Sequence, residues 1–370
     1  MDPNILSFEH DEIIEDDVLK TARTNLYITN SGNQDVTSVG YTYNTQKKDG
    51  SYSKSFTNGF YTPLAPGYSW SGDLKSDYTG AVPFSDVQDF EIQGYNYTMG
   101  GRRYTVDLQQ QTVTSVQETT DQDYRTEDYR QVNILKAEFG DQKNSETFAV
   151  PYTITNNSED IIDGCLLFFH YTDQSGRNFV VTSTGAYANF IASGKSMKSL
   201  LQLDIQANDA KDIGLAGYSY AKGDRNYLVD PLDQTASSDQ IRNVIPYDDS
   251  KDILTFSTSA SSTDSNTWNV TATVKGNPEL PVDKDNLWVT AVFLDKDGNW
   301  LGDSQMPLMQ ASDESYFSNI RIMLADQDLL NEVSSVQIIS YSYKWADDAN
   351  DADNRHGYSI YPESRKMFGY

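Results

Sequence analysis

The chain has very little cysteine and histidine, and this scarcity limits the chemistry that it can carry. Cys165 is the single cysteine of the 370 residues, so the chain can form neither an internal disulfide nor a cysteine-rich zinc site. Cys165 lies in an apolar run, where we expect a small buried side chain. The three histidines, His10, His170 and His356, do not occur at metal-ligand spacing or in a known catalytic motif. We therefore expect a protein that is not an enzyme.

Positive charge and long apolar runs are also scarce. Lys and Arg number 28 against 54 Asp and Glu, which gives a net charge of −26. Such a chain repels nucleic-acid phosphates and anionic headgroups, so we expect no nucleic-acid partner. No apolar run reaches the roughly 20 residues of a membrane-spanning helix, so we expect no spanning segment. Residues 1–4 lack the features of a signal peptide, which predicts either a cytoplasmic protein or a leader that is absent from this sequence.

Tyrosine, by contrast, is abundant, and it occurs together with many Thr, Ser, Asn and Gly residues. The chain has 25 Tyr, and this composition is typical of β-strands and their turns. Turn signals arrive about every ten residues, and no long helical period lies between them. The sequence therefore predicts an all-β fold of the β-sandwich type. Acidic β-repeats of this composition suit a cell exterior, so we favour a removed leader over a cytoplasmic protein.

One short stretch recurs three times at a fixed interval. GYNY at 94–97 returns as GYSY at 217–220 and SYSY at 340–343, an interval of 123 residues each time. In each copy a predicted helical turn precedes the strand and a hairpin follows it. A period of this length fits tandem whole domains. We predict an elongated array of three immunoglobulin-like β-sandwich domains, joined by polar linkers and spanning residues 1–114, 128–232 and 248–370.

The turn order of the second unit supports a family resemblance. From Tyr152 to Gly194 the order is strand, Asn-Asn-Ser turn, long strand, Asp-x-x-Gly turn and Ser-Gly corner. This order resembles the immunoglobulin-like β-sandwich repeats of secreted and lipid-anchored Gram-positive bacterial proteins, including the group known by an F-x-L-Y-D signature. The likeness covers all three units in outline, although the signature itself is absent. It implies an extracytoplasmic, non-catalytic module and transfers no functional residues to this chain.

The repeated tyrosines are candidate ligand-binding residues. Strand alternation places Phe90 and Ile92 on one face and the following tyrosines on the other, where exposed rings could stack on a sugar or a partner. This hypothesis covers Tyr95, Tyr97, Tyr218, Tyr220, Tyr341, Tyr343 and the neighbouring Trp345. The alternative is that the rings pack against Tyr104 and Tyr227 across the strands, or that a bulge turns them inward.

An acidic insertion distinguishes the third unit. The hairpin spacing is 7 residues from Tyr97 to Tyr104 and 15 residues from Tyr343 to Tyr358. Insertions on a repeated scaffold often carry function. We hypothesise that this loop binds Ca²⁺ or a basic partner, and the alternative is a solvated loop. The candidate ligands for the ion are Asp347, Asp348, Asp351 and Asp353. No other cofactor is expected.

These features together predict a non-catalytic bacterial protein of the cell surface or exterior that binds or spaces, with a protein or a glycan as its partner. Two alternatives remain open. One is a carbohydrate-binding or adhesin protein that uses exposed tyrosine faces. The other is a polysaccharide hydrolase with catalytic carboxylates in an inter-domain cleft.

Overall fold

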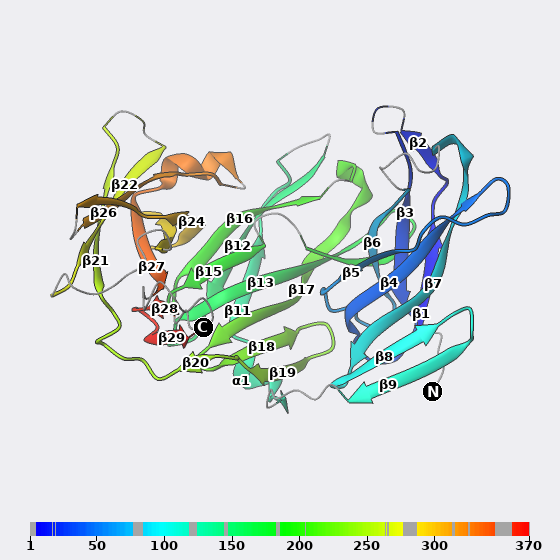
Figure 1. Cartoon of the computed structure of the whole chain (residues 1–370), viewed down its shortest axis with the longest axis horizontal. Helices are drawn as coiled ribbons and strands as arrows, with labels where there is room; N and C mark the ends of the chain where they lie inside the picture. Colours follow the sequence, from blue (N-terminus) through cyan, green and yellow to red (C-terminus); the bar gives the residue numbers. More distant parts are fainter. Residues whose placement is uncertain are drawn as a thin grey trace, which may run out of the picture.

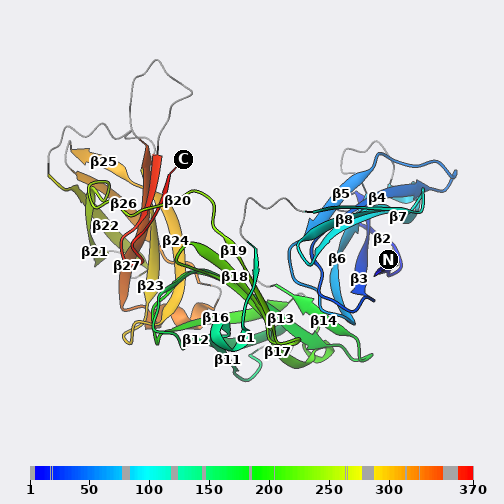
Figure 2. The same cartoon turned by 90° about the horizontal axis from the view of Figure 1, so that it is seen from below.

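The structure is a computed structural model that describes residues 5–16, 18, 20–76, 84–117, 124–143, 147–182, 186–203, 205–262, 264, 266–276, 287–312, 315–324, 326–344 and 357–369. Their regular secondary structure is almost entirely β-strand. They follow one another as an N-terminal segment (5–117), a middle segment (124–240) and a C-terminal segment (244–369), which lie side by side in chain order (Figure 1). The two outer segments lean to the same side of the middle one, so that the chain forms an arc (Figure 2).

The strands form two long sheets that pass from one segment to the next and two shorter sheets within single segments. The first long sheet has the order β1 (Leu6–His10), β3 (Thr21–Asn30), β6 (Tyr68–Lys75), β14 (Asn178–Val181), β13 (Ile162–Thr172), β17 (Lys211–Lys222), β18 (Arg225–Asp230), β19 (Thr235–Gln240) and β10 (Arg125–Thr126), with β2 (Ile14–Asp16) on β3 and β15 (Tyr187–Ile191) on β13. The second has the order β11 (Leu135–Phe139), β12 (Phe148–Asn156), β16 (Ser196–Leu203), β24 (Trp300–Pro307), β23 (Trp288–Leu294), β27 (Ser335–Lys344), β28 (Gly357–Tyr361), β29 (Lys366–Gly369) and β20 (Val244–Ile245).

The shorter sheets belong to the two outer segments. The N-terminal segment adds β5 (Phe56–Phe60), β4 (Thr37–Lys47), β7 (Val87–Met99), β8 (Arg102–Asp107) and β9 (Thr112–Gln117). The C-terminal segment adds β21 (Leu254–Ala260), β22 (Thr267–Val274), β26 (Ser315–Arg321) and β25 (Met309–Ser312). The expected all-β, sandwich-like structure is confirmed at this level of description.

The helical elements are short. Besides α1 (Tyr129–Val132), the 3-10 turns η1 (Phe84–Asp86), η2 (Ala207–Asp209) and η3 (Gln327–Glu332) immediately precede β7, β17 and β27. The predicted helical turn ahead of each repeated strand is therefore confirmed. Among the described residues, no helix has the length and apolar character needed to cross a membrane.

Alternating burial along the strands produces three clusters of buried side chains. In β4, Tyr41 and Tyr43 point into the N-terminal cluster, while Thr42 between them is only half-buried. Because successive side chains of a strand point to opposite faces, this alternation follows directly from the sequence pattern. The clusters do not stop at segment borders: Phe168 of the middle segment belongs to the N-terminal cluster, and Trp300 of the C-terminal segment belongs to the middle one.

The repeated tyrosines lie inside these clusters, so the expected exposure of their rings is wrong. All six are at most 3% exposed: Tyr95, Tyr97, Tyr218, Tyr220, Tyr341 and Tyr343. Their rings stack along the strand and across it, with centroids 5.1 Å apart for Tyr97 and Tyr104 and 5.0 Å apart for Tyr220 and Tyr227. The alternative of cross-strand packing is the one that the structure contains.

A β-bulge explains why the alternation rule placed these rings on the wrong face. In β7 the register to β4 shifts between the pairs Thr42↔Gly94 and Tyr43↔Ile92, so that one residue of β7 is left over. The same shift occurs in β17 and in β27. One extra residue reverses the face of the sheet to which the following side chains point. Side chains on both sides of the bulge therefore reach the core. At Gly94 a Cβ would lie 2.7 Å from the carbonyl oxygen of Val106, which favours glycine there.

Two buried asparagines hold two equivalent strand corners. Asn30 Nδ2 donates to the carbonyl of Leu64 at 2.7 Å, and Asn156 Nδ2 donates to the carbonyl of Ile191 at 3.2 Å. Each corner then turns at a glycine with positive φ, +78° at Gly67 and +67° at Gly194, so the expected Ser-Gly corner is present at Gly194. A buried amide group destabilises the fold unless it is hydrogen-bonded. Here each asparagine side chain is hydrogen-bonded to the main chain of the corner that faces it.

The stretches that we expected to be linkers contain strands. β9 extends to residue 117, and β10, β19 and β20 lie within residues 115–127 and 233–247. β10 pairs with β19 through Arg125↔Ser238 and Thr126↔Ser237. Polar Thr and Ser residues occur in short strands at or near a sheet edge as well as in loops, so composition alone did not distinguish the two.

We predict that the buried tyrosine hydroxyls differ sharply in what they contribute to stability. The Tyr218 hydroxyl accepts from Leu135 N–H at 3.2 Å and donates to Asn133 Oδ1 at 2.9 Å, so Tyr218→Phe should reduce the free energy of unfolding by about 1–2 kcal/mol. The Tyr97 hydroxyl is buried and has no hydrogen-bond partner in the described structure. Tyr97→Phe should therefore be neutral or slightly stabilising in the same denaturant titration. Equal losses for both variants would contradict this account.

Candidate functional site

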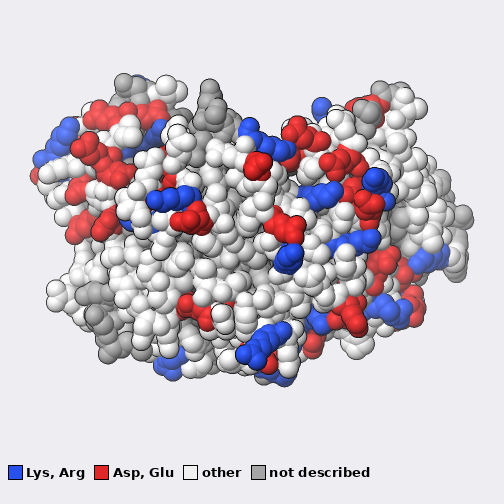
Figure 3. All heavy atoms as spheres, turned by 180° about the vertical axis from the view of Figure 1, so that it is seen from behind, with Lys and Arg blue, Asp and Glu red and all other residues white. Residues whose placement is uncertain are grey.

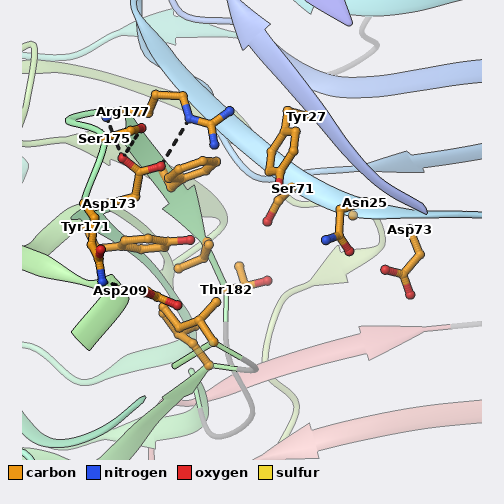
Figure 4. Close-up of a pocket in the computed structure, with 16 residues that line it drawn as sticks. Asn25, Tyr27, Ser71, Asp73, Tyr171, Asp173, Ser175, Arg177, Thr182 and Asp209 are labelled. Atoms are coloured by element: carbon orange, nitrogen blue, oxygen red, sulfur yellow. Dashed lines mark hydrogen bonds and ion pairs between the residues drawn. The ribbon is translucent and has the colours of Figure 1, made fainter. Parts of the chain in front are cut away.

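A cleft lies where the N-terminal and the middle segments meet. Its volume is about 550 Å³. One wall comes from β3 and β6 of the N-terminal segment, and the other from β13, β14, the end of β16 and η2 of the middle segment. Figure 4 shows Asn25, Tyr27, Ser71 and Asp73 facing the residues of the middle segment across the opening. The cleft exists only because the two segments are joined.

A cation and two aromatic rings close one end of the cleft. The guanidinium carbon of Arg177 lies 4.7 Å from the centroid of the Tyr27 ring and 5.5 Å from that of Phe179. Tyr171 stacks on Phe179 with centroids 5.1 Å apart. The Tyr27 hydroxyl donates to Asp11 Oδ2 at 2.8 Å, and burial together with this carboxylate raises the pKa of Tyr27. Cation–π contact of this kind positions Arg177 across the joint between the segments.

Asp173, the carboxylate that binds Arg177, has both of its oxygens hydrogen-bonded within its own hairpin. Asp173 Oδ2 accepts from Arg177 Nε at 3.2 Å, and Oδ1 accepts from Arg177 N–H at 2.8 Å and from the Ser175 hydroxyl at 2.7 Å. Burial opposes its ionisation, but these hydrogen bonds outweigh burial and lower the pKa of Asp173. Asp173 therefore stays ionised and has a structural role. Asp209, on the same side of the cleft, accepts from Gln174 Nε2 at 2.8 Å.

The remaining wall offers both apolar and polar groups. Leu203 is buried, and Val181 and Ile205 are half-buried, so these three form an apolar patch. Asn25, Asp73 and Thr182 are exposed polar residues that line the same space. This volume and mixture fall within the range of small-molecule sites, which span about 300–1,000 Å³. The arrangement is suited to binding a small polar, hydroxyl-rich ligand.

A pair of carboxyl groups lies at the same joint. Asp35, between β3 and β4, approaches Asp230 at the end of β18, with Asp233 nearby. Burial and the neighbouring carboxylates raise the pKa of Asp35 to about 8, and burial also raises the pKa of Asp230. Asp35 Oδ1 is buried without a hydrogen-bond partner among the described residues. A proton held by the pair would relieve both the repulsion and the unpaired oxygen.

The joint between the middle and the C-terminal segments instead uses lysine–carboxylate pairs. Lys198 Nζ lies 2.7 Å from Asp295 Oδ2, and Lys366 Nζ lies 2.8 Å from Asp163 Oδ2. Burial opposes ionisation of Asp295, but hydrogen bonds from Lys198 and Asn299 outweigh it and lower the pKa of Asp295 to about 2. Burial raises the pKa of Asp163, and Lys366 opposes that rise. Both pairs connect residues of different segments.

None of the predicted site residues that the structure describes lines the cleft. The six repeated tyrosines are buried in the clusters described above. Trp345, Asp347, Asp348, Asp351 and Asp353 lie outside the described residues. Among the residues that the structure describes, no group of three or more His, Cys, Asp and Glu side chains could hold a metal ion. Sequence reasoning missed the cleft residues because the two walls are at least 98 positions apart in the chain, from Asp73 to Tyr171 at the nearest, and only the Asp-x-x-Gly turn at Asp173 gave a local signal.

The surface drawn in Figure 3 has no continuous basic tract among its described residues. Lys and Arg side chains stand singly or in small groups beside acidic ones, with a broad area of uncharged residues between them. This mixed pattern agrees with the strongly acidic composition.

Comparison with known proteins gives no identification. The chain matches no known family model and no curated protein sequence. Red sea bream transglutaminase is a structural neighbour with 10% identity and a TM-score of 0.18, and 64% of this chain covers 30% of that one. The structure titled pT26-6p gives 8% identity and a TM-score of 0.15, with 64% and 65% of the two chains covered. The chain thus spans less than two thirds of either neighbour, and such low scores support no inference about function.

We predict that the Asp35 pair makes stability fall as pH rises. An Asp has a pKa of about 3.9 in the unfolded chain, and that of Asp35 is about 8 in the folded one. The folded chain therefore binds this proton more tightly than the unfolded chain does. The resulting stabilisation is complete below the pKa of the unfolded chain and is lost as pH rises through the pKa of the folded chain. Asp35→Asn should remove this dependence and be more stable than the parent at pH 9, on the order of 1 kcal/mol after allowance for solvent screening.

Denaturant titration of both proteins at pH 5 and pH 9 measures this difference. Asp73→Asn, at an exposed carboxylate that lines the cleft, is the matched control and should preserve the parent's pH dependence. If Asp35→Asn and Asp73→Asn behave alike between the two pH values, the carboxyl pair does not hold the proton that we assign to it.

Proposed function

We propose that this chain is a non-catalytic, extracytoplasmic protein of the bacterial surface, built from three tandem immunoglobulin-like β-sandwiches that together act as a rigid spacer with a binding cleft. The observation that carries this proposal is the pairing of edge strands between segments. β14 pairs in parallel with β6 through Asn178↔Tyr68 and Phe179↔Ser69, and β24 pairs in parallel with β16 through Met197↔Trp300. Both joints therefore use the same kind of connection.

Several further contacts support a rigid array. Parallel pairing at a joint removes open sheet edges and orders the backbone across the border. Besides the buried pair of Lys366 and Asp163, Lys143 Nζ lies 2.7 Å from both Asp326 Oδ2 and Asp328 Oδ2, again between the middle and the C-terminal segments. Segments linked only by flexible linkers would be free to swing. A fixed spacing between the two ends of the array would suit presentation of a binding site away from a surface.

A second candidate function, carbohydrate binding, is favoured by the cleft rather than by the tyrosines. Its exposed Asn25, Asp73 and Thr182 could exchange hydrogen bonds with sugar hydroxyls, while the apolar patch could contact a ring face. The hydrolase alternative receives less support, because Asp173 is committed to its hairpin and its pKa is lowered rather than raised.

We predict that removing one partner of the buried lysine–carboxylate pair opens the joint between the middle and the C-terminal segments. The side chains of Lys366 and Asp163 are 4% and 9% exposed, so Lys366→Met would leave an uncompensated buried carboxylate, a change that typically costs about 3–5 kcal/mol. Small-angle X-ray scattering should then give a larger maximum dimension and a more flexible ensemble than the parent. Limited proteolysis should cut near residues 241–247.

The double variant Lys366→Met with Asp163→Leu is the matched control. Because it removes both charges, it should recover most of the rigidity of the parent. If scattering of the unmodified chain already shows freely jointed segments, or if Lys366→Met leaves both the envelope and the cleavage pattern unchanged, the rigid-spacer proposal is wrong.

We also predict that any glycan binding of this protein depends on the cleft. On a glycan array, Asp73→Ala and Asn25→Ala should each weaken the signal about tenfold, since each removes a polar group that lines the opening. Tyr124→Ala, at an exposed tyrosine that is not among the residues lining the cleft, should bind like the parent. Binding that survives both cleft substitutions, or turnover of a polysaccharide that one carboxylate substitution abolishes, would contradict this assignment.

A further inference from the structure

Each of the three segments has a hairpin with the same main-chain hydrogen bond. In the middle and the C-terminal segments, this hairpin leads into the strand that forms the joint. A main-chain N–H at the start of the turn donates to a main-chain carbonyl four residues on: Lys47 to Ser51 at 2.8 Å, Asp173 to Arg177 at 2.9 Å and Asp295 to Asn299 at 3.0 Å. The residues that follow these turns are Tyr52, Asn178 and Trp300. Asn178 and Trp300 are the positions at which the strand of the preceding segment pairs. Tyr52 therefore occupies the corresponding position in the N-terminal segment.

The main chain of Tyr52 is oriented to accept such a strand. Tyr52 and Gln46 form an isolated antiparallel bridge, and the hydrogen bonds that flank it are Lys47 N–H to Ser51 O and Ser53 N–H to Thr45 O. In this arrangement the bridged residues direct their own N–H and C=O groups away from each other. The outward-pointing N–H and C=O groups of Tyr52 have no main-chain partner among the described residues. At the equivalent positions, Asn178 and Trp300 lie next to β6 and β16.

The side chain of Tyr52 is also more exposed than that of its counterpart. Tyr52 is 47% exposed, whereas Trp300, which packs in the core cluster of the middle segment, is 4% exposed. An exposed aromatic ring beside an unpaired strand edge is typical of an interaction surface, because ring burial and main-chain pairing then act together. The edge continues along β5, where Thr57, Asn58 and Gly59 are exposed.

The charged residue at the start of this turn has the opposite sign to its counterpart at the joint between the middle and the C-terminal segments. There Asp295 receives Lys198, which lies one residue beyond Met197, the residue paired with Trp300. In the N-terminal segment the turn position of Asp295 is occupied by Lys47. A strand that docks at Tyr52 in the same geometry would therefore place the side chain that corresponds to Lys198 next to Lys47. An acidic side chain there would be complementary, and a basic one would be repelled.

We propose that the edge at Tyr52 binds an extended segment of a separate polypeptide, which pairs in parallel with Tyr52 and carries an Asp or Glu next to the paired residue, facing Lys47. The proposal rests on continuity with the two joints inside the chain. In a second copy of this chain the strands that correspond to the occupant of such a joint are already used, because β6 and β16 are paired at joints and β25 covers the edge of β26. The docking is independent of the cleft and of any glycan binding.

Two synthetic peptides test this inference against the full-length chain. Both have the sequence of residues 194–203, which includes β16, and one carries Lys198→Glu. In fluorescence anisotropy the Glu peptide should bind roughly 5-fold more tightly than the Lys peptide, the effect of about 1 kcal/mol for one partly exposed charge pair. Lys47→Glu in the protein should reverse this preference. Because Lys47 is half-buried in a hairpin, a circular dichroism melt accompanies each variant.

Tyr52→Ala and Tyr124→Ala form the matched pair of protein variants, since both tyrosines are 47% exposed. Tyr52→Ala should weaken the Glu peptide about tenfold, and Tyr124→Ala should leave its affinity unchanged. Equal binding of the two peptides, no binding by either at about 1 mM, or insensitivity to Tyr52→Ala would overturn the proposal. Dimers in sedimentation velocity that Tyr52→Ala abolishes would also overturn it, because the occupant would then be a second copy.

Discussion

The pairing of one strand edge with the next segment is the constraint on which the rest of this structure depends. A sheet edge exposes unpaired N–H and C=O groups, and proteins need to pair, cover or blunt it. Here β6 and β16 find their partners in the following segment, while β26 is covered within its own segment by β25 through Met309↔Phe317. The cleft, the buried ion pairs and the merged core clusters all follow from joints built in this way.

The two joints use the acidic composition differently. Between the middle and the C-terminal segments, lysines such as Lys198 and Lys366 compensate carboxylates that burial would otherwise penalise. Between the N-terminal and the middle segments, Asp35 and Asp230 meet without a lysine, and contact depends instead on Arg177 and aromatic rings. One joint therefore keeps its charges compensated over a wide pH range, whereas the other gains from holding a proton. This asymmetry places the pH-sensitive element beside the cleft.

Much of the local structure could be predicted from sequence, because it rests on short-range rules. The corners at Gly67 and Gly194 and the helical turns before β7, β17 and β27 follow from turn and capping chemistry. The facing of Tyr95 and its equivalents could not be predicted, because a single bulge residue reverses the alternation and leaves no mark in composition. The strands at 235–240 and the cleft were missed for a related reason: both depend on pairing between distant parts of the chain.

The hydrogen bonds of the cleft carboxylates are the reason that we propose recognition rather than reaction. A carboxylate that acts as a general acid needs a raised pKa and a free oxygen, and one that acts as a nucleophile needs an unobstructed approach. Asp173 meets neither condition, since both of its oxygens accept hydrogen bonds within the hairpin, and Asp209 is engaged by Gln174. The carboxyl group with the strongly raised pKa, Asp35, is not among the residues that line the cleft. The charged groups of this joint therefore fix the relative position of two segments, which leaves the cleft between them as the site of the ligand binding that we propose.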